Sequence, residues 1–221
     1  AHGAKMPAIG FGTMELPHRP AELVAAAIAD GYRHIDTARK YGTEERVGDG
    51  IRASGIARKD LFVTTKVTEL DAREADFLRS AETSLKALGL DDVDLLLIHW
   101  PNPRVPLAET LGAMAEMKQE GYARQIGVSN FTVALLDEAS RISSEPLVCD
   151  QVECHPFLNQ DKVVAACRKH GKWPGIGGAY SEELLKLYTD KGMTLILAGN
   201  DLPMLIAAAR GHQANVRAFQ K

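Results

Sequence analysis

The run VDLLLIHW, residues 93–100, is a short apolar segment that closes on a polar side chain, His99. Such a run is typical of a β-strand. An amphipathic segment follows at 106–121, PLAETLGAMAEMKQEG, and Gly121 stands where a helix would end. Its apolar face recurs at helical spacings of three or four: Leu107, Leu111, Met114 and Met117. A second β-rich run, ARQIGVSN at 123–130, completes a predicted strand–helix–strand unit of a parallel sheet.

The same alternation extends in both directions from this unit. Strands are also predicted at 7–13, 32–38, 61–67, 147–155, 175–181 and 193–200. Helices are predicted at 74–90, at 182–191 after a Ser181 cap, and after a cap at Asn200 or Asp201. Eight such units predict a single domain, residues 1–221, folded as a (β/α)₈ TIM barrel of minimal length. The alternative, an open doubly wound sheet, is disfavoured because no strand leads into a GxGxxG turn.

Composition narrows the class of protein. The chain has 221 residues, 45% of them hydrophobic and 25% charged, with a formal net charge of −3, which is ordinary for a soluble globular protein and argues against nucleic-acid partners. Cys149, Cys154 and Cys167 form no CxxC pair, which indicates reduced thiols. The first residues, AHGAKMPAIGFG, lack the apolar core of a signal peptide, and no run is long enough for a membrane helix. We expect a cytoplasmic monomer.

Polar residues close most of the apolar runs. In strand order these are Asp36, Lys66, His99, Ser129 with Asn130, Gln151 and Tyr180, while Tyr41 follows Asp36 in the next loop. Active-site residues of a (β/α)₈ barrel lie at the carboxyl ends of its strands, so we expect these side chains to converge at one mouth. Glu153 and His155 end the sixth strand without a third ligand in reach, which disfavours a metal site.

Four of these residues make a coherent proton-transfer set: Asp36, Tyr41, Lys66 and His99. A tyrosine ionises near pH ~10, and a neighbouring ammonium would lower that pKa by stabilising the phenolate. An aspartate would keep the lysine charged, and a histidine would orient a carbonyl oxygen. Each residue also has a structural interpretation: the aspartate and the lysine as ordinary strand ends, the histidine as a core residue, and the tyrosine as loop packing. His34 is interpreted as packing.

Five motifs in order, HIDTARKYGTEERVG, TTKV, LIHWP, IGVSNF and QVECHP, resemble those of the aldo-keto reductases from about residue 6 to residue 171. The resemblance implies NADPH as the cofactor and a carbonyl compound as the substrate. It makes Tyr41 the proton donor, tuned by Lys66 and Asp36, with His99 orienting the substrate. Ser129, Asn130 and Gln151 would hold the nicotinamide carboxamide, Gly12 and Thr13 would lie along the cofactor, and Tyr180 would stack on the nicotinamide.

Residues 172–221 depart from that family's pattern. By resemblance, cations should grip the phosphates of NADPH after the last two strands, but Glu182, Glu183 and Asp201 stand there, so weak NADPH binding is expected. This segment is instead similar to the last quarter of the HpcH/HpaI class II pyruvate aldolases, which implies a chimeric barrel with a reductase part at 1–171 and an aldolase part at 172–221. The alternative function is therefore a recombined, engineered barrel that retains the site residues without significant activity.

Overall fold

The computed structural model describes residues 3–14, 16, 18–152, 160–171, 175–177, 182–190 and 195–197. The strands are β1 (Ile9–Gly12), β2 (His34–Asp36), β3 (Phe62–Val67), β4 (Val93–Ile98), β5 (Ala123–Ser129), β6 (Leu147–Gln151), β7 (Gly175–Gly177) and β8 (Leu195–Leu197). The α-helices are α1 (Pro20–Ala29), α2 (Glu44–Ala53), α3 (Glu74–Leu88), α4 (Leu107–Gln119), α5 (Val133–Ile142), α6 (Asp161–Lys169) and α7 (Glu182–Asp190). Short 3₁₀ turns are η1 (Arg39–Tyr41), η2 (Arg58–Asp60) and η3 (Glu69–Asp71).

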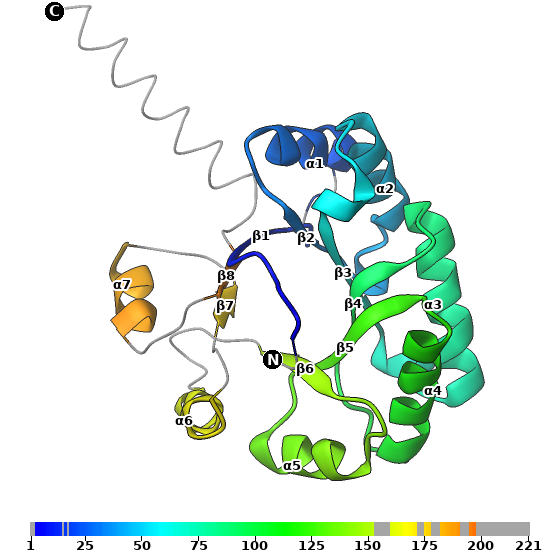
Figure 1. Cartoon of the computed structure of the whole chain (residues 1–221), viewed down its shortest axis with the longest axis vertical. Coiled ribbons are helices and arrows are strands. Elements are labelled where there is room, and N and C mark those ends of the chain that lie inside the picture. Colours follow the sequence, from blue (N-terminus) through cyan, green and yellow to red (C-terminus); the bar gives the residue numbers. More distant parts are fainter. Residues whose placement is uncertain are drawn as a thin grey trace, which may run out of the picture.

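All the strands pair in parallel, in the order β6-β5-β4-β3-β2-β1-β8-β7. Strand β1 lies between β2 and β8, with Phe11 opposite Ile35 and Ile9 opposite Ile196. This order runs once around a ring, which is the topology of a (β/α)₈ barrel and excludes the doubly wound sheet. Figure 1 shows the strands β1–β6 curving together with the helices α1–α5 along their outer side. Within the described residues, no ladder joins β6 to β7.

The predicted elements are confirmed wherever the structure describes them. Each of the eight apolar runs contains one observed strand, and the predicted helices at 74–90, 106–121 and 182–191 correspond to α3, α4 and α7. Gly89 ends α3 with a φ of 65°, and Gly121 follows α4 with a φ of 83°, left-handed values that glycine adopts without a steric penalty. The proposed caps Ser181, Asn200 and Asp201 lie outside the described residues.

The core lies between the barrel strands and the outer helices. All six residues of β4 are buried, because helices cover one face of the strand and the barrel interior the other. Helix α2 packs closely between α1 and α3. A side chain at Gly48 would lie 2.2 Å from the Leu88 carbonyl oxygen of α3, and one at Gly50 would lie 2.5 Å from the Ala21 oxygen of α1. These two glycines therefore permit the close approach of the three helices.

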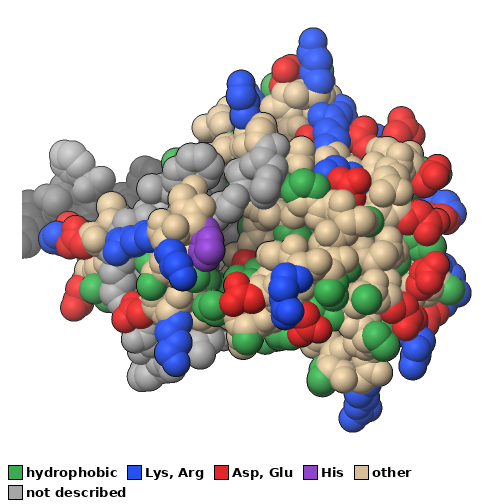
Figure 2. Space-filling model, turned by 60° about the horizontal axis from the view of Figure 1, so that its bottom comes forward, with side chains coloured by type: hydrophobic (Ala, Val, Ile, Leu, Met, Phe, Trp, Pro, Cys, Tyr) green, Lys and Arg blue, Asp and Glu red, His purple; other side chains and the backbone are tan. Residues whose placement is uncertain are grey.

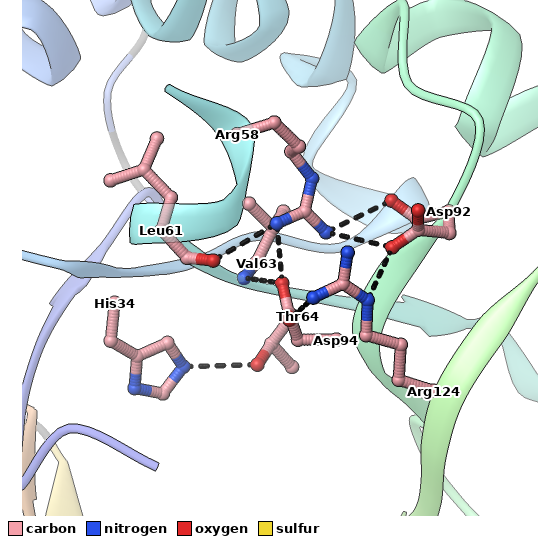
Figure 3. Close-up of polar contacts among 8 residues, drawn as sticks. All are labelled: His34, Arg58, Leu61, Val63, Thr64, Asp92, Asp94 and Arg124. Carbon is pink, nitrogen blue, oxygen red and sulfur yellow. Dashed lines mark hydrogen bonds and ion pairs between the residues drawn. The ribbon is translucent and has the colours of Figure 1, made fainter. Parts of the chain in front are cut away.

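An ion-pair network joins β3, β4 and β5 at their amino-terminal ends, opposite the predicted site (Figure 3). Its centre is Asp94, whose carboxylate accepts hydrogen bonds from Val63 N at 2.9 Å and from Arg124 Nη1 at 3.1 Å. Arg58 Nη1 lies 2.6 Å from Asp94 Oδ2, the oxygen that also accepts from Val63 N. Asp92 Oδ1 lies 2.9 Å from Arg124 Nε and 3.3 Å from Arg58 Nη2. Each arginine therefore forms ion pairs with both aspartates. The network fixes the register of three neighbouring strands.

His34, also drawn in Figure 3, is a packing residue within the described structure. It is buried, its Nε2 lies 2.9 Å from Thr64 Oγ1, and its ring packs edge-on against Phe62. Burial lowers its pKa, so the imidazole is held neutral inside the barrel.

The surface carries charges of both signs. On the face drawn in Figure 2, acidic and basic side chains are interspersed without a field of one sign. Over the described residues, no helix combines the length and apolar character needed to cross a bilayer.

Candidate active site

Parallel register brings the predicted site residues to one end of the barrel. Asp36 is the last residue of β2, Lys66 lies one residue before the end of β3, and His99 directly follows β4. The ladders keep these ends level, because Asp36 pairs with Thr64 and the His99 N–H donates to Val67 O at 2.9 Å. The turn η1 carries Tyr41 back over β3.

A buried ion pair forms the base of the site. Lys66 Nζ lies 2.5 Å from Asp36 Oδ1 and donates to the Thr37 carbonyl oxygen at 3.0 Å. The Lys66 side chain is 1% exposed and that of Asp36 is 5% exposed. Burial opposes the lysine charge, but Asp36 and Tyr41 outweigh it and raise the pKa of Lys66 above its usual value. Lys66 is therefore an ammonium ion at neutral pH.

Tyr41 lies against this pair. Lys66 Nζ is 5.4 Å from the centre of the Tyr41 ring, so the positive charge of the ammonium acts on the phenol. Sequence reasoning expected the pKa of Tyr41 to fall. That expectation of a net decrease is wrong: burial raises the pKa of Tyr41 and outweighs the lowering by Lys66, while Asp36 raises it further. Tyr41 is therefore protonated at neutral pH.

His99 completes a first group of site residues, together with Asp36, Lys66 and Tyr41. Its ring packs edge-on against that of Tyr41, with the ring centres 5.7 Å apart and the planes at 80°. Burial, followed by the charges of Lys66 and Lys40, lowers the pKa of His99 to about 4. The imidazole is thus neutral at physiological pH, and its buried Nδ1 has no hydrogen-bond partner in the part of the chain that the structure describes. A neutral imidazole offers one N–H donor, the group needed to orient a carbonyl oxygen.

A second group lies at the ends of β5 and β6. Ser129 Oγ donates to Gln151 O, and Asn130 Nδ2 donates to His99 O at 3.0 Å and to Ser129 Oγ at 3.1 Å. Asn130 has a φ of 60°, a left-handed conformation that asparagine tolerates better than most residues. This backbone turn directs the Asn130 amide towards β4, so the amide and hydroxyl groups adjoin the backbone of His99.

Gln151 connects the two groups. Its Nε2 donates to Asp36 Oδ2 at 3.1 Å, across the mouth of the barrel. Because a carboxylate only accepts hydrogen bonds, this contact directs the NH₂ end of the amide towards Asp36. Within the described part of the chain, the amide oxygen of Gln151 has no partner. That oxygen is available to a ligand N–H.

The end of β1 borders the same mouth. Thr13 is buried, and its hydroxyl donates to the Asp36 carbonyl oxygen at 3.1 Å. A side chain added at Gly12 would meet no atom of the described residues within 4 Å, so a flat ligand could approach the backbone there. Trp100 is 37% exposed beside the site. Tyr180, Glu153, His155 and Cys154 lie outside the described residues.

Sequence reasoning missed three features. These are the contact between Gln151 and Asp36, the buried Glu44 at the start of α2, and Asp150 of β6. Asp150 is half-buried, and burial of its carboxyl group raises its pKa to about 7. For Asp150 the sequence signal was a polar residue inside an apolar strand, and for Glu44 it was a polar residue at the start of a helix. A residue of this kind is usually interpreted as a solvated side chain. Across the described residues, no cluster of three histidine, cysteine or acidic side chains could hold a metal ion.

Comparison with known proteins identifies the family. Residues 8–174 match the aldo/keto reductase family, and the chain belongs to it. An aldo-keto reductase of Mycobacterium tuberculosis is 44% identical over 167 residues, which are 75% of this chain and 59% of that protein. A methylglyoxal reductase of Escherichia coli O157:H7 is 40% identical over 170 residues, which are 75% of this chain and 64% of that protein. The chain thus spans about three fifths of the length of these relatives.

Solved structures support the same fold. The crystal structure of a Bombyx mori aldo-keto reductase in complex with NADP superimposes with a TM-score of 0.77 at 30% identity. The match covers 90% of this chain and 81% of that one. The (β/α)₈ architecture deduced from the strand order is therefore the architecture of the family.

Proposed function

We propose that this chain reduces an aldehyde or ketone with NADPH, with Tyr41 as the proton donor. The observation that carries the proposal is the buried Asp36–Lys66 pair beneath the Tyr41 phenol. NADPH, when bound, supplies the hydride that adds to the carbonyl carbon. The chain supplies the proton: Tyr41 gives its hydroxyl proton to the developing alkoxide, and the adjacent Lys66 ammonium stabilises the phenolate that remains.

The other two residues support this transfer. Asp36 keeps Lys66 charged in a buried position, where an unpaired ammonium would lose its proton. His99, neutral because its pKa is about 4, donates a hydrogen bond to the carbonyl oxygen and holds it near Tyr41. The raised pKa of Tyr41 keeps the phenol protonated before reaction, as a proton donor requires.

The cofactor would be held by the second group. The amide oxygen of Gln151, which has no partner among the described residues, fits the amide end of a nicotinamide together with Ser129 and Asn130. The backbone at Gly12 and Thr13 would lie along the cofactor. Tyr180 is proposed to stack on the nicotinamide by family resemblance alone. NADPH is therefore the proposed cofactor.

We propose further that NADPH binds weakly. Glu182 and Glu183 open α7 as exposed carboxylates, where the family resemblance calls for groups that bind phosphate. Like charges a few ångströms apart cost about 1–4 kcal/mol at partial exposure. Each charge-assisted hydrogen bond lost to a phosphate removes about 1.5–3 kcal/mol. Together these effects weaken binding by several orders of magnitude.

The experiment is a titration of protein fluorescence with NADPH, followed by reduction of a generic aromatic aldehyde. We expect a dissociation constant above the micromolar range and slow turnover that Tyr41→Phe abolishes. Sub-micromolar binding would refute the weak-binding proposal. Turnover that persists unchanged in Tyr41→Phe would refute the assignment of the proton donor.

The origin of residues 172–221 is a separate proposal. The family match ends at residue 174, and the likeness of the rest to pyruvate aldolases, with the chimeric barrel that it implies, rests on sequence alone. If that barrel has lost significant activity, purified protein will show no aldehyde reduction above the Tyr41→Phe background at saturating NADPH. The monomeric state, the cytoplasmic location and the absence of nucleic-acid partners are likewise proposals. Size-exclusion chromatography with light scattering tests the first of them.

A further inference from the structure

A buried carboxylate outside the proposed catalytic group begins the helix that follows Tyr41 in the chain. Glu44, the first residue of α2, is 3% exposed. Its Oε1 accepts a hydrogen bond from Thr65 Oγ1 at 2.6 Å. Its Oε2 has no hydrogen-bond partner among the described residues and lies 3.8 Å from Arg39 Nη1. A carboxylate is costly to bury, so a group in this position requires a structural or functional reason.

The two partners of Glu44 lie on either side of the site. Thr65 immediately precedes Lys66 on β3, and alternation along the strand directs Lys66 into the barrel and Thr65 towards the helices. Arg39 begins the turn η1 that ends in Tyr41. Glu44 itself follows Tyr41 by three residues, after Gly42 with a φ of 67°. One carboxylate is thus connected to the strand that carries Lys66 and to the turn that carries Tyr41.

We propose that Glu44 is a positioning residue, which sets the distance between the Tyr41 hydroxyl and the Lys66 ammonium by fastening η1 and the start of α2 to β3 through Thr65. The inference rests on the proposed function, because it assigns a purpose to that distance. The amino terminus of helix α2 favours the negative charge of Glu44. Burial nevertheless raises the pKa of Glu44, against the lowering effects of Thr65, Ser84 and Arg39.

The same turn contains a natural control. Lys40, between Arg39 and Tyr41, forms an ion pair with Glu69 at 3.3 Å, with side chains 55% and 29% exposed. Exposed pairs of this kind contribute little to stability or geometry. Lys40→Met should therefore leave Tyr41 in place, whereas loss of the Glu44–Thr65 hydrogen bond should not.

The test follows Tyr41 directly, without cofactor or turnover. The chain is labelled with ¹³Cζ-tyrosine, and among its five tyrosines the Tyr41 resonance is the one missing from Tyr41→Phe. In Thr65→Val, which keeps the side-chain shape but not the hydroxyl, we expect this resonance to move towards that of an exposed tyrosine. Its pKa should fall towards the ordinary ~10, because the turn withdraws from its buried position. Thr65→Ser should restore the original resonance.

Turnover gives a second readout. We expect kcat to fall about tenfold in Thr65→Val with little change in KM, and Thr65→Ser to recover it. A folded Thr65→Val with an unchanged Tyr41 resonance and titration would overturn the inference, as would an equal displacement in Lys40→Met. If Thr65→Val does not fold, Glu44→Gln decides by the same resonance. The two proposals can also fail separately. If the unmodified chain shows no turnover but Thr65→Val still displaces the Tyr41 resonance, the positioning role is supported and the proposed function is refuted.

Discussion

Gln151 and Asp36 are 115 residues apart in sequence, yet Gln151 Nε2 donates a hydrogen bond to Asp36 Oδ2 at 3.1 Å. Because Lys66 occupies Oδ1, both oxygens of Asp36 are bonded, one to the proton-transfer group and the other to the amide proposed to hold the cofactor. A substitution at Gln151 should therefore change the electrostatic environment of the Asp36–Lys66 pair next to Tyr41.

Gln151→Glu should destabilise the fold in a pH-dependent way. It places a second carboxyl against Asp36, and two adjacent carboxylates raise the pKa of one of them in the folded state. A raised folded-state pKa gives stability that is complete at low pH and is lost as pH rises. We expect the loss of unfolding free energy relative to the unmodified chain to be about 1–2 kcal/mol larger at pH 8 than at pH 5. Gln151→Leu, measured in parallel by urea denaturation, should give a loss independent of pH, and equal slopes in the two variants would contradict the contact.

Lys66→Met should be strongly destabilising. It leaves the Asp36 carboxylate buried without its cation, and breaking a buried pair in this way costs about 3–5 kcal/mol. Removing both charges together, in Asp36→Asn with Lys66→Met, should recover part of that loss. Urea denaturation checks both. The exposed Lys86–Glu82 pair is the matched control, since Lys86→Met should change stability little.

Asp94→Asn should loosen the barrel at the end opposite the site. The change removes the charge that binds Arg58 and Arg124, and we expect a loss of about 2–3 kcal/mol of unfolding free energy. Because the network lies at the amino-terminal ends of the strands, the Tyr41 resonance should stay where it is. A shift of that resonance in Asp94→Asn, in folded protein, would contradict the separation of the two ends.

Asp150 should make stability depend on pH between about 4 and 7. Burial raises its pKa from 3.8 to about 7, so the unfolded chain releases this proton before the folded chain does. The contribution of Asp150 is therefore complete below pH 4, declines as pH rises, and is constant above pH 7. Allowing for its partial exposure, we expect a decline of about 2 kcal/mol.

Asp150→Asn removes that proton and should flatten the curve. The unfolding free energies of the variant and the unmodified chain, measured from pH 4 to pH 8, should converge at low pH and diverge at high pH, with the variant the more stable. Parallel curves would show that Asp150 ionises normally in the folded protein.

Local sequence pattern predicts the elements of this fold well, and contacts between distant elements poorly. Strands and helices are indicated by local features, namely apolar runs and the glycines that follow helices, such as Gly89 and Gly121. These elements could therefore be predicted from the sequence. The convergence of Asp36, Lys66 and His99 followed from one rule of barrel geometry. The bond from Gln151 to Asp36 and the burial of Glu44 depend on packing between elements far apart in sequence.

Electrostatic balance is harder still to predict from sequence. That Lys66 would lower the pKa of Tyr41 was a sound inference from residue types, and the structure contains that effect. The net direction is set by how deeply the phenol is buried, which no motif encodes. Asp150 illustrates the same point, because its pKa depends on how far the fold buries its carboxyl group.

The pairing of Ile9 with Ile196 has a consequence for biosynthesis. Strand β1 is made before its other neighbours in the sheet, and β8 is made after the other strands that the structure describes. At about 5–20 residues per second, the interval between them is roughly 10–40 s. Throughout that time the outer edge of β1 presents unpaired backbone groups that other chains can bind. The ring of strands can therefore close only after β8 has been made, and chaperones that shield strand edges should increase the yield of folded protein.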